Sequence, residues 1–220
     1  MFAIWGLIYL GFIAYAIFQS LPSQRENPRL RNIGWIFVVS CVANIIWLLF
    51  FHYNQFVLSM VAMTVLLIAL AVIYLTLRAG RPKRSAVPVA AAGDKTWSVT
   101  RAERLAVWLL FSIDLGWITV ATVANAAHVL VDAGWTGEPL PALVWLIVMY
   151  GVALLLAALV ALTQRDVAYL LVLVWAFIGI AVNYSSMTGV LVSSIVAALL
   201  VGVLALLFAV RGAWQGKTYA

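Results

Sequence analysis

The feature that most constrains this chain is a series of seven apolar stretches, each close to the length at which a helix crosses a membrane. A spanning helix needs about 20 mostly apolar residues. The runs are continuous, without the alternating pattern of a barrel strand, and hydrophobic residues form 66% of the chain. The sequence therefore predicts an all-α, polytopic transmembrane bundle of seven helices at 1–19, 33–51, 56–77, 105–131, 143–163, 167–183 and 188–210.

The basic residues are distributed on one side of these stretches. All 13 Lys and Arg residues lie in the connections after the first, third and fifth stretches or in the C-terminal tail. Because positively charged loops stay in the cytoplasm, we expect these connections and the C-terminus to be cytoplasmic, in a bacterial inner membrane. Spread over short loops, the basic residues suit contact with lipid headgroups and not a nucleic-acid footprint.

The same topology sets the direction of the first stretch. Its N-terminus should lie on the outer side, yet the stretch starts at Met1 without a polar flank or a cationic region. We expect from this that an upstream helix is missing, which would make eight helices in the complete protein. The alternative is a true start at Met1, with the N-terminus inserted outward.

The connections and the reactive side chains give structural signals. Thr100 and Glu103 have the spacing of a capping box at the start of a helix, and Asp166 is placed to cap the following stretch. The long connection 78–103 is expected to be a mobile boundary. With a single cysteine, Cys41, no internal disulfide forms, and neither histidine has partners at metal-ligand spacing.

Polar and aromatic side chains inside the apolar stretches carry the functional information. At 3.6 residues per turn they fall on one face of each of three helices. Because the first helix runs inward and the other two run outward, the parts of these faces at Trp5 and Tyr9, at 44–51 and at 117–128 come together in the outer half of the membrane. The faces hold Trp5, Tyr9, Phe12 and Ala16; Ser40, Asn44, Trp47 and Phe51; and Asp114, Trp117, Ala121, Asn125 and His128.

Two interpretations of these faces remain open. Flat rings with a few fixed hydrogen-bonding groups suit a large planar hydrophobic ligand. Amides and hydroxyls also join helices as hydrogen-bonded pairs, and tryptophan gathers at membrane surfaces. Asp114 is costly at mid-bilayer, by about 2.5–3.5 kcal/mol on insertion scales. As a neutral acid it could serve a ligand or a neighbouring helix equally well.

Three short motifs resemble a known family. Ile4-Trp5-Gly6-Leu7-Ile8-Tyr9, Ala43-Asn44-Ile45-Ile46-Trp47 followed by Phe50-Phe51, and Leu115-Gly116-Trp117-Ile118-Thr119-Val120-Ala121 with Asn125 occur in this order. They are similar to the second, third and fifth helices of the TspO/MBR family of tryptophan-rich sensory or translocator proteins. The resemblance covers residues 1–131, with the cytoplasmic loop 78–103 inside it. Residues 132–220 then form an additional region of three helices, as in an extended bacterial form of the family.

The resemblance implies an intramembrane pocket for porphyrins, haem precursors or sterol-like molecules, often in a dimer. The family's pocket residues correspond here to Trp5, Tyr9, Asn44, Trp47, Trp117 and Asn125. The helix faces add Phe51, Asp114 and Ala121 to this candidate ligand site. The family's first helix and the loop that lids the cavity have no counterpart in this chain. We expect no obligatory cofactor, and a porphyrin or haem-type molecule is the candidate ligand.

The sequence leaves functions other than a membrane receptor to consider: an assembly subunit, a transporter and an enzyme. A structural or assembly subunit of a larger membrane complex would use the aromatic faces for packing. A transporter is less well supported, since no inverted repeat or pair of broken helices is evident. No nucleophile, base and orienting group can be assembled into an enzyme site. In the last three helices Tyr169, Trp175 and Asn183 are the candidates for more than packing.

Overall fold

The computed structural model describes residues 3–79, 99–139 and 141–217, with side chains up to residue 211. All regular elements in these ranges are helical, which confirms the predicted class. They are α1 (Ile4–Ser20), η1 (Pro22–Gln24), α2 (Pro28–His52), α3 (Phe56–Ala79), α4 (Arg101–Glu103), η2 (Arg104–Leu109), α5 (Leu110–Asp132), α6 (Ala142–Gln164), α7 (Val167–Asn183) and α8 (Thr188–Lys217).

Each predicted stretch forms a helix. In the described part of the chain, five helices are long and apolar enough to cross a membrane, counting α4, the π-helical η2 and α5 as one continuous helix over Arg101–Asp132. The helices α1 and α7 are also apolar but have 17 residues each, the lower end of the spanning range at about 1.5 Å per residue. Most of the connection 78–103, expected to be mobile, lies outside the described residues.

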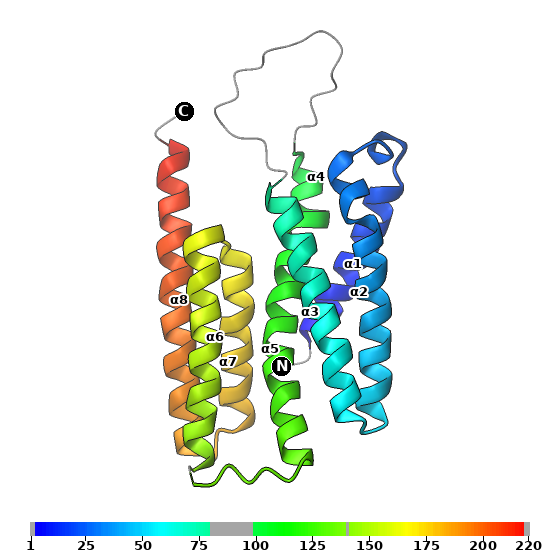
Figure 1. The fold of residues 1–220 in the computed structure, drawn as a ribbon. Coiled ribbons are helices and arrows are strands. Elements are labelled where there is room, and N and C mark those ends of the chain that lie inside the picture. Colours follow the sequence, from blue (N-terminus) through cyan, green and yellow to red (C-terminus); the bar gives the residue numbers. More distant parts are fainter. Residues whose placement is uncertain (1–2, 80–98, 140, 218–220) are drawn as a thin grey trace.

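The helix α5 occupies the centre of the bundle. Figure 1 shows α6, α7 and α8 on one side of α5, and α1, α2 and α3 on the other. The α1–α2 and α6–α7 connections lie at the same end as the C-terminus, and the α2–α3, α5–α6 and α7–α8 connections lie at the opposite end. Among the described residues the basic side chains therefore gather at one end, as the charge pattern predicts.

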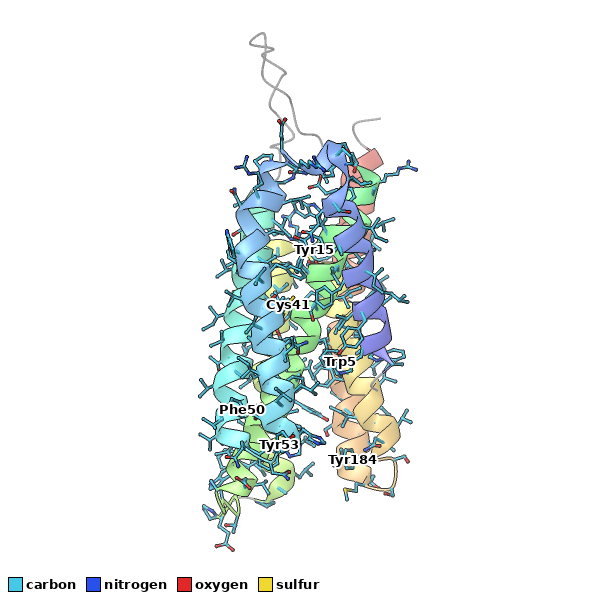
Figure 2. The ribbon with its side chains drawn as sticks, turned by 90° about the vertical axis from the view of Figure 1, so that its right-hand side faces the viewer. Trp5, Tyr15, Cys41, Phe50, Tyr53 and Tyr184 are labelled. Atoms are coloured by element: carbon cyan, nitrogen blue, oxygen red, sulfur yellow. The ribbon has the colours of Figure 1, made fainter. Side chains whose placement is uncertain are left out.

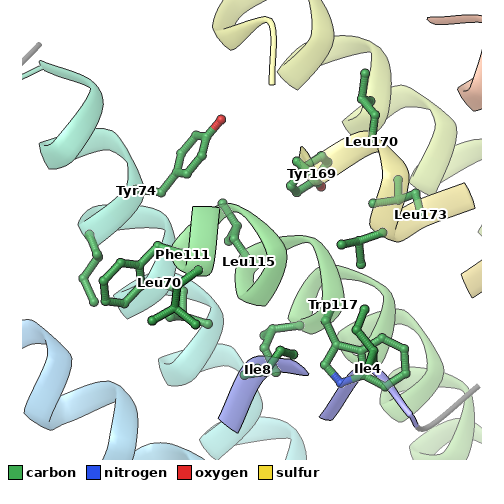
Figure 3. Packing of buried hydrophobic residues seen from close by; sticks show 14 of the residues in the cluster. Ile4, Ile8, Leu70, Tyr74, Phe111, Leu115, Trp117, Tyr169, Leu170 and Leu173 are labelled. Carbon is green, nitrogen blue, oxygen red and sulfur yellow. The ribbon is translucent and has the colours of Figure 1, made fainter. Parts of the chain in front are cut away.

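Close packing on both faces of α5 fixes its position. Figure 3 shows Phe111 and Leu115 of α5 between Leu70 of α3 and Tyr169 of α7. At Gly116, a Cβ atom would lie 3.1 Å from Val172 Cβ and 3.2 Å from the Tyr169 carbonyl oxygen. The missing side chain lets the backbones of α5 and α7 approach, and this contact joins the two halves of the bundle.

Asp166 joins three helices through its carboxylate. It caps α7 as predicted, accepting hydrogen bonds from the backbone N–H groups of Ala168 and Tyr169. Its other oxygen accepts from the hydroxyl of Tyr74 on α3 at 2.8 Å and from that of Ser112 on α5 at 2.6 Å. Arg78 at the end of α3 forms an ion pair with the same carboxylate. Asp166 thus connects α7 to both α3 and α5.

The predicted capping box is half correct. The Thr100 hydroxyl accepts a hydrogen bond from the Glu103 N–H at 3.1 Å. The Glu103 carboxylate does not complete the box, because it forms two bonds of 2.6 and 2.8 Å with the Arg29 guanidinium of α2. Both side chains are buried, and a buried guanidinium requires a carboxylate more strongly than an exposed N–H does.

Asp166→Asn tests whether the carboxylate holds the halves together. Asparagine keeps a good helix cap but leaves Arg78 without its counter-ion, so we expect the free energy of unfolding to fall by about 3 kcal/mol. Chemical denaturation in detergent, followed by circular dichroism, measures this. Glu138→Gln, at an exposed loop carboxylate, is the control and should change it by less than about 0.5 kcal/mol. Equal effects would contradict the assigned role.

Candidate functional site

Rings from three helices meet where the sequence predicts. The Trp5 ring lies nearly parallel to that of Trp47, with centroids 6.1 Å apart and 15° between planes. It meets the Trp117 ring edge-on at 6.0 Å and stacks on Tyr9 at 5.6 Å, and Trp47 contacts Phe51 at 5.9 Å. The expected convergence of α1, α2 and α5 is confirmed, and we call these five residues the aromatic cluster.

The row of rings continues toward the end of the bundle that lacks basic residues. Phe51 contacts Phe56 of α3 and His128 of α5, both at 5.5 Å, and His128 stacks on Phe56 at 5.9 Å. Sequence analysis placed His128 on this face but missed Phe56, because α3 has no polar face that would draw attention to it. Ala121, between Trp117 and His128 on α5, is half-buried.

The expected inner face of α1 needs correction. The buried residues of this helix are Ile4, Ile8, Tyr15 and Phe18. Ala16, predicted to face inward, is exposed, and the Tyr9 side chain is 50% exposed. Branched aliphatic side chains fill the interface with α5, so α1 is rotated and Tyr9 lies at the rim of the aromatic cluster. Trp5 and Phe12 are half-buried, between rim and core.

Asn125 is engaged in packing between helices. Its side chain is buried, its amide oxygen accepts a hydrogen bond from Ser59 of α3 at 3.2 Å, and its amide nitrogen lies 3.6 Å from the Met60 sulfur. The carboxamide therefore joins α5 to α3. Of the two interpretations open from the sequence, these contacts favour the interhelical hydrogen bond at this position.

Asn44 and Trp47, unlike Asn125, each have a buried polar atom without a hydrogen bond within the described ranges. Among the described residues, the buried Oδ1 of Asn44 and the buried Nε1 of Trp47 have no hydrogen-bond partner. Asn44 lines a cavity of about 30 Å³ enclosed by α1, α2, α3 and α5. Its other lining residues are Phe12, Ser40, Cys41, Leu66, Asp114 and Ile118. Drug-sized ligands occupy sites of roughly 300–1,000 Å³, so this cavity does not admit one as it stands.

A larger, apolar groove lies on the other side of α1. It has a volume of about 320 Å³ and runs between α1, the η2–α5 helix and α7. Its lining residues are Ala3, Ile4, Leu7, Leu109, Ile113, Ala168, Leu171, Val172 and Trp175. Sequence analysis selected Trp175 but not the groove. The sequence signal for this groove is a helical spacing that places four of its lining residues on one face of α7: Ala168, Leu171, Val172 and Trp175.

The comparison with protein families gives one match. A family model described as "TSPO-like protein" matches residues 1–210. No curated protein and no solved structure matches the chain. The matched range extends through α6, α7 and most of α8, helices that lie beyond the residues carrying the motif resemblance.

Asn125→Ala should lower the free energy of unfolding by about 1 kcal/mol, because intramembrane hydrogen bonds average ~0.6 kcal/mol and reach ~1.7. Ser59→Ala removes the other partner and should cost a similar amount. If the two groups bind each other, the double variant is less destabilised than the sum of the single ones. Strict additivity, measured by denaturation in detergent, would contradict the pairing.

Proposed function

The chain belongs to the TSPO-like protein family, and on that premise we propose that this integral membrane protein is a receptor for a planar hydrophobic molecule. A porphyrin or another tetrapyrrole is the first candidate, and a sterol-like molecule the second. One observation carries the proposal. Indole rings from α1, α2 and α5 converge at one depth, beside polar atoms of Asn44 and Trp47 that have no partner among the described residues. Rings supply stacking surfaces, and such polar atoms orient a ligand.

Binding at the aromatic cluster requires the rings to separate. Atoms in contact lie about 3.5–4.0 Å apart, so a planar molecule between Trp5 and Trp47 needs about 7 Å or more between the ring planes. The centroids of these rings are 6.1 Å apart. Trp5 lies in the first turn of α1, and Tyr9 is half exposed at the rim. We therefore propose entry from the lipid on the α1 side, with α1 moving away from α2.

The charge pattern supports an orientation for this receptor. With the basic end in the cytoplasm, the part of the aromatic cluster near the end of α2, Trp47 and Phe51, would lie in the half of the membrane away from the cytoplasm, because the α2–α3 connection lies opposite the basic end. The ligand would then reach it from the outer leaflet of a bacterial inner membrane. We propose that ligand binding is signalled to a partner in the membrane, which is a second copy of this chain or another subunit of a larger complex.

A structural role is the second candidate, and a specific observation favours it. The rings of the aromatic cluster already contact one another, and Asn125 is hydrogen-bonded within the bundle. An assembly subunit would have the same contacts without a ligand. The two roles differ in whether the indoles report saturable binding.

Titration with protoporphyrin IX tests the proposal through tryptophan fluorescence. We expect saturable quenching in the purified protein. Trp117→Phe and Trp47→Phe should each weaken binding by roughly threefold to tenfold, the loss of about 0.5–1.5 kcal/mol of aromatic contact.

Trp35→Phe is the matched control. This indole is 82% exposed on the lipid-facing side of α2, so its replacement should leave the dissociation constant unchanged. Linear, unsaturable quenching of the wild type, or equal affinity in all variants, would refute a receptor at the aromatic cluster and favour the packing role.

A further inference from the structure

The small polar cavity lies deep in the membrane-spanning part of the bundle. Figure 2 shows Cys41, one of its lining residues, at mid-height between Tyr15 and Trp5. Four helices contribute to its wall, and three of the seven lining residues, Phe12, Leu66 and Ile118, are apolar. The polar groups therefore share this space with hydrocarbon side chains and with no charged residue of opposite sign.

Two of the residues that line this space, Asp114 and Asn44, have oxygens without a hydrogen-bond partner in the described ranges. Asp114 is only 4% exposed, and no hydrogen bond joins its carboxyl group to another residue in the described ranges. The Oδ1 atom of Asn44 is likewise without a partner there. The Ser40 hydroxyl donates to the Phe37 carbonyl at 2.7 Å and also lies within hydrogen-bonding reach of the Cys41 thiol, which leaves it a lone pair for a further contact. The oxygens of Asp114 and Asn44 are the ones that need a donor or a cation.

The charge and the size of the cavity determine what kind of ion it can bind. A carboxylate removed from water is costly without a counter-charge, and the residues lining the cavity include no Lys or Arg. Carboxylate, amide and hydroxyl oxygens are ligands for hard cations. At about 10–15 Å³ for each water-sized sphere, the cavity volume of about 30 Å³ has room for two or three such spheres, so an ion that binds there must be small and largely dehydrated. A single carboxylate neutralises one positive charge, which selects a monovalent ion over a divalent one.

We propose that this cavity binds one sodium ion, with oxygens of Asp114, Asn44 and Ser40 as ligands. Asn44 and Asp114 each precede a tryptophan of the aromatic cluster, Trp47 and Trp117, by three residues. The ion therefore joins α2 to α5 one helical turn from these rings and fixes their spacing. If Asn44 binds the ion, Trp47 Nε1 remains to orient the ligand of the proposed function.

Thermal unfolding of the purified protein in detergent tests this site. Sodium, potassium and choline chloride are compared at equal ionic strength, with sodium then varied against choline. The wild type should show a melting temperature that rises with sodium concentration, by at least about 2 °C at saturation, and rises less with potassium. Asp114→Asn should abolish the difference between sodium and choline. Asp132→Asn, at an exposed carboxylate at the end of α5, should retain it.

The comparison of salts on the wild type decides the proposal even if Asp114→Asn does not fold. Ser40→Ala offers a second variant, which should raise the sodium concentration for half-maximal stabilisation several-fold. Identical melting temperatures in sodium and choline would overturn the proposal and leave water beside a neutral Asp114. A sodium effect that survives in Asp114→Asn would also overturn it, because the ion would then bind elsewhere.

Discussion

Hydrocarbon offers no hydrogen-bond partner, so a polar side chain inside a membrane bundle must find one within the protein, and a charged one needs a partner on another element. In this structure the resulting contacts hold the helices in place. Asp166 connects α7 to Tyr74 of α3 and Ser112 of α5, and Glu103 binds Arg29 of α2. Each pair spans elements far apart in sequence, and together they fix α5 at the centre.

The aromatic cluster follows from this arrangement. With α5 fixed between α3 and α7, Trp117 is held toward α1 and α2, where it meets Trp5. Asp114 and Asn44 depart from this pattern, and both line the same cavity one turn away. A buried polar group without a partner is costly. The ligand and the sodium ion that we propose would each remove part of this cost.

Properties of single helices could be predicted from the sequence. Apolar length gave the seven helices, and the position of Asp166 before an apolar run gave its role as a cap. Properties that depend on packing between helices could not. The rotation of α1 could not be predicted, because α1 is apolar on all sides and its sequence does not indicate which face is buried. In the structure Ile4 and Ile8 fill the interface with α5 better than Tyr9 does. The partners of Glu103 and Asn125 lie 74 and 66 residues away, beyond the reach of spacing arguments.

The central claim is that the indoles of α1, α2 and α5 form the ligand site. Photo-cross-linking with a diazirine derivative of protoporphyrin, followed by peptide mass spectrometry, locates that site directly in the membrane-embedded protein. We predict labels on the segments around Trp5, Trp47 and Trp117, reduced by excess protoporphyrin. Labels confined to the groove residues near Trp175, or labels that excess protoporphyrin does not reduce, would contradict the claim.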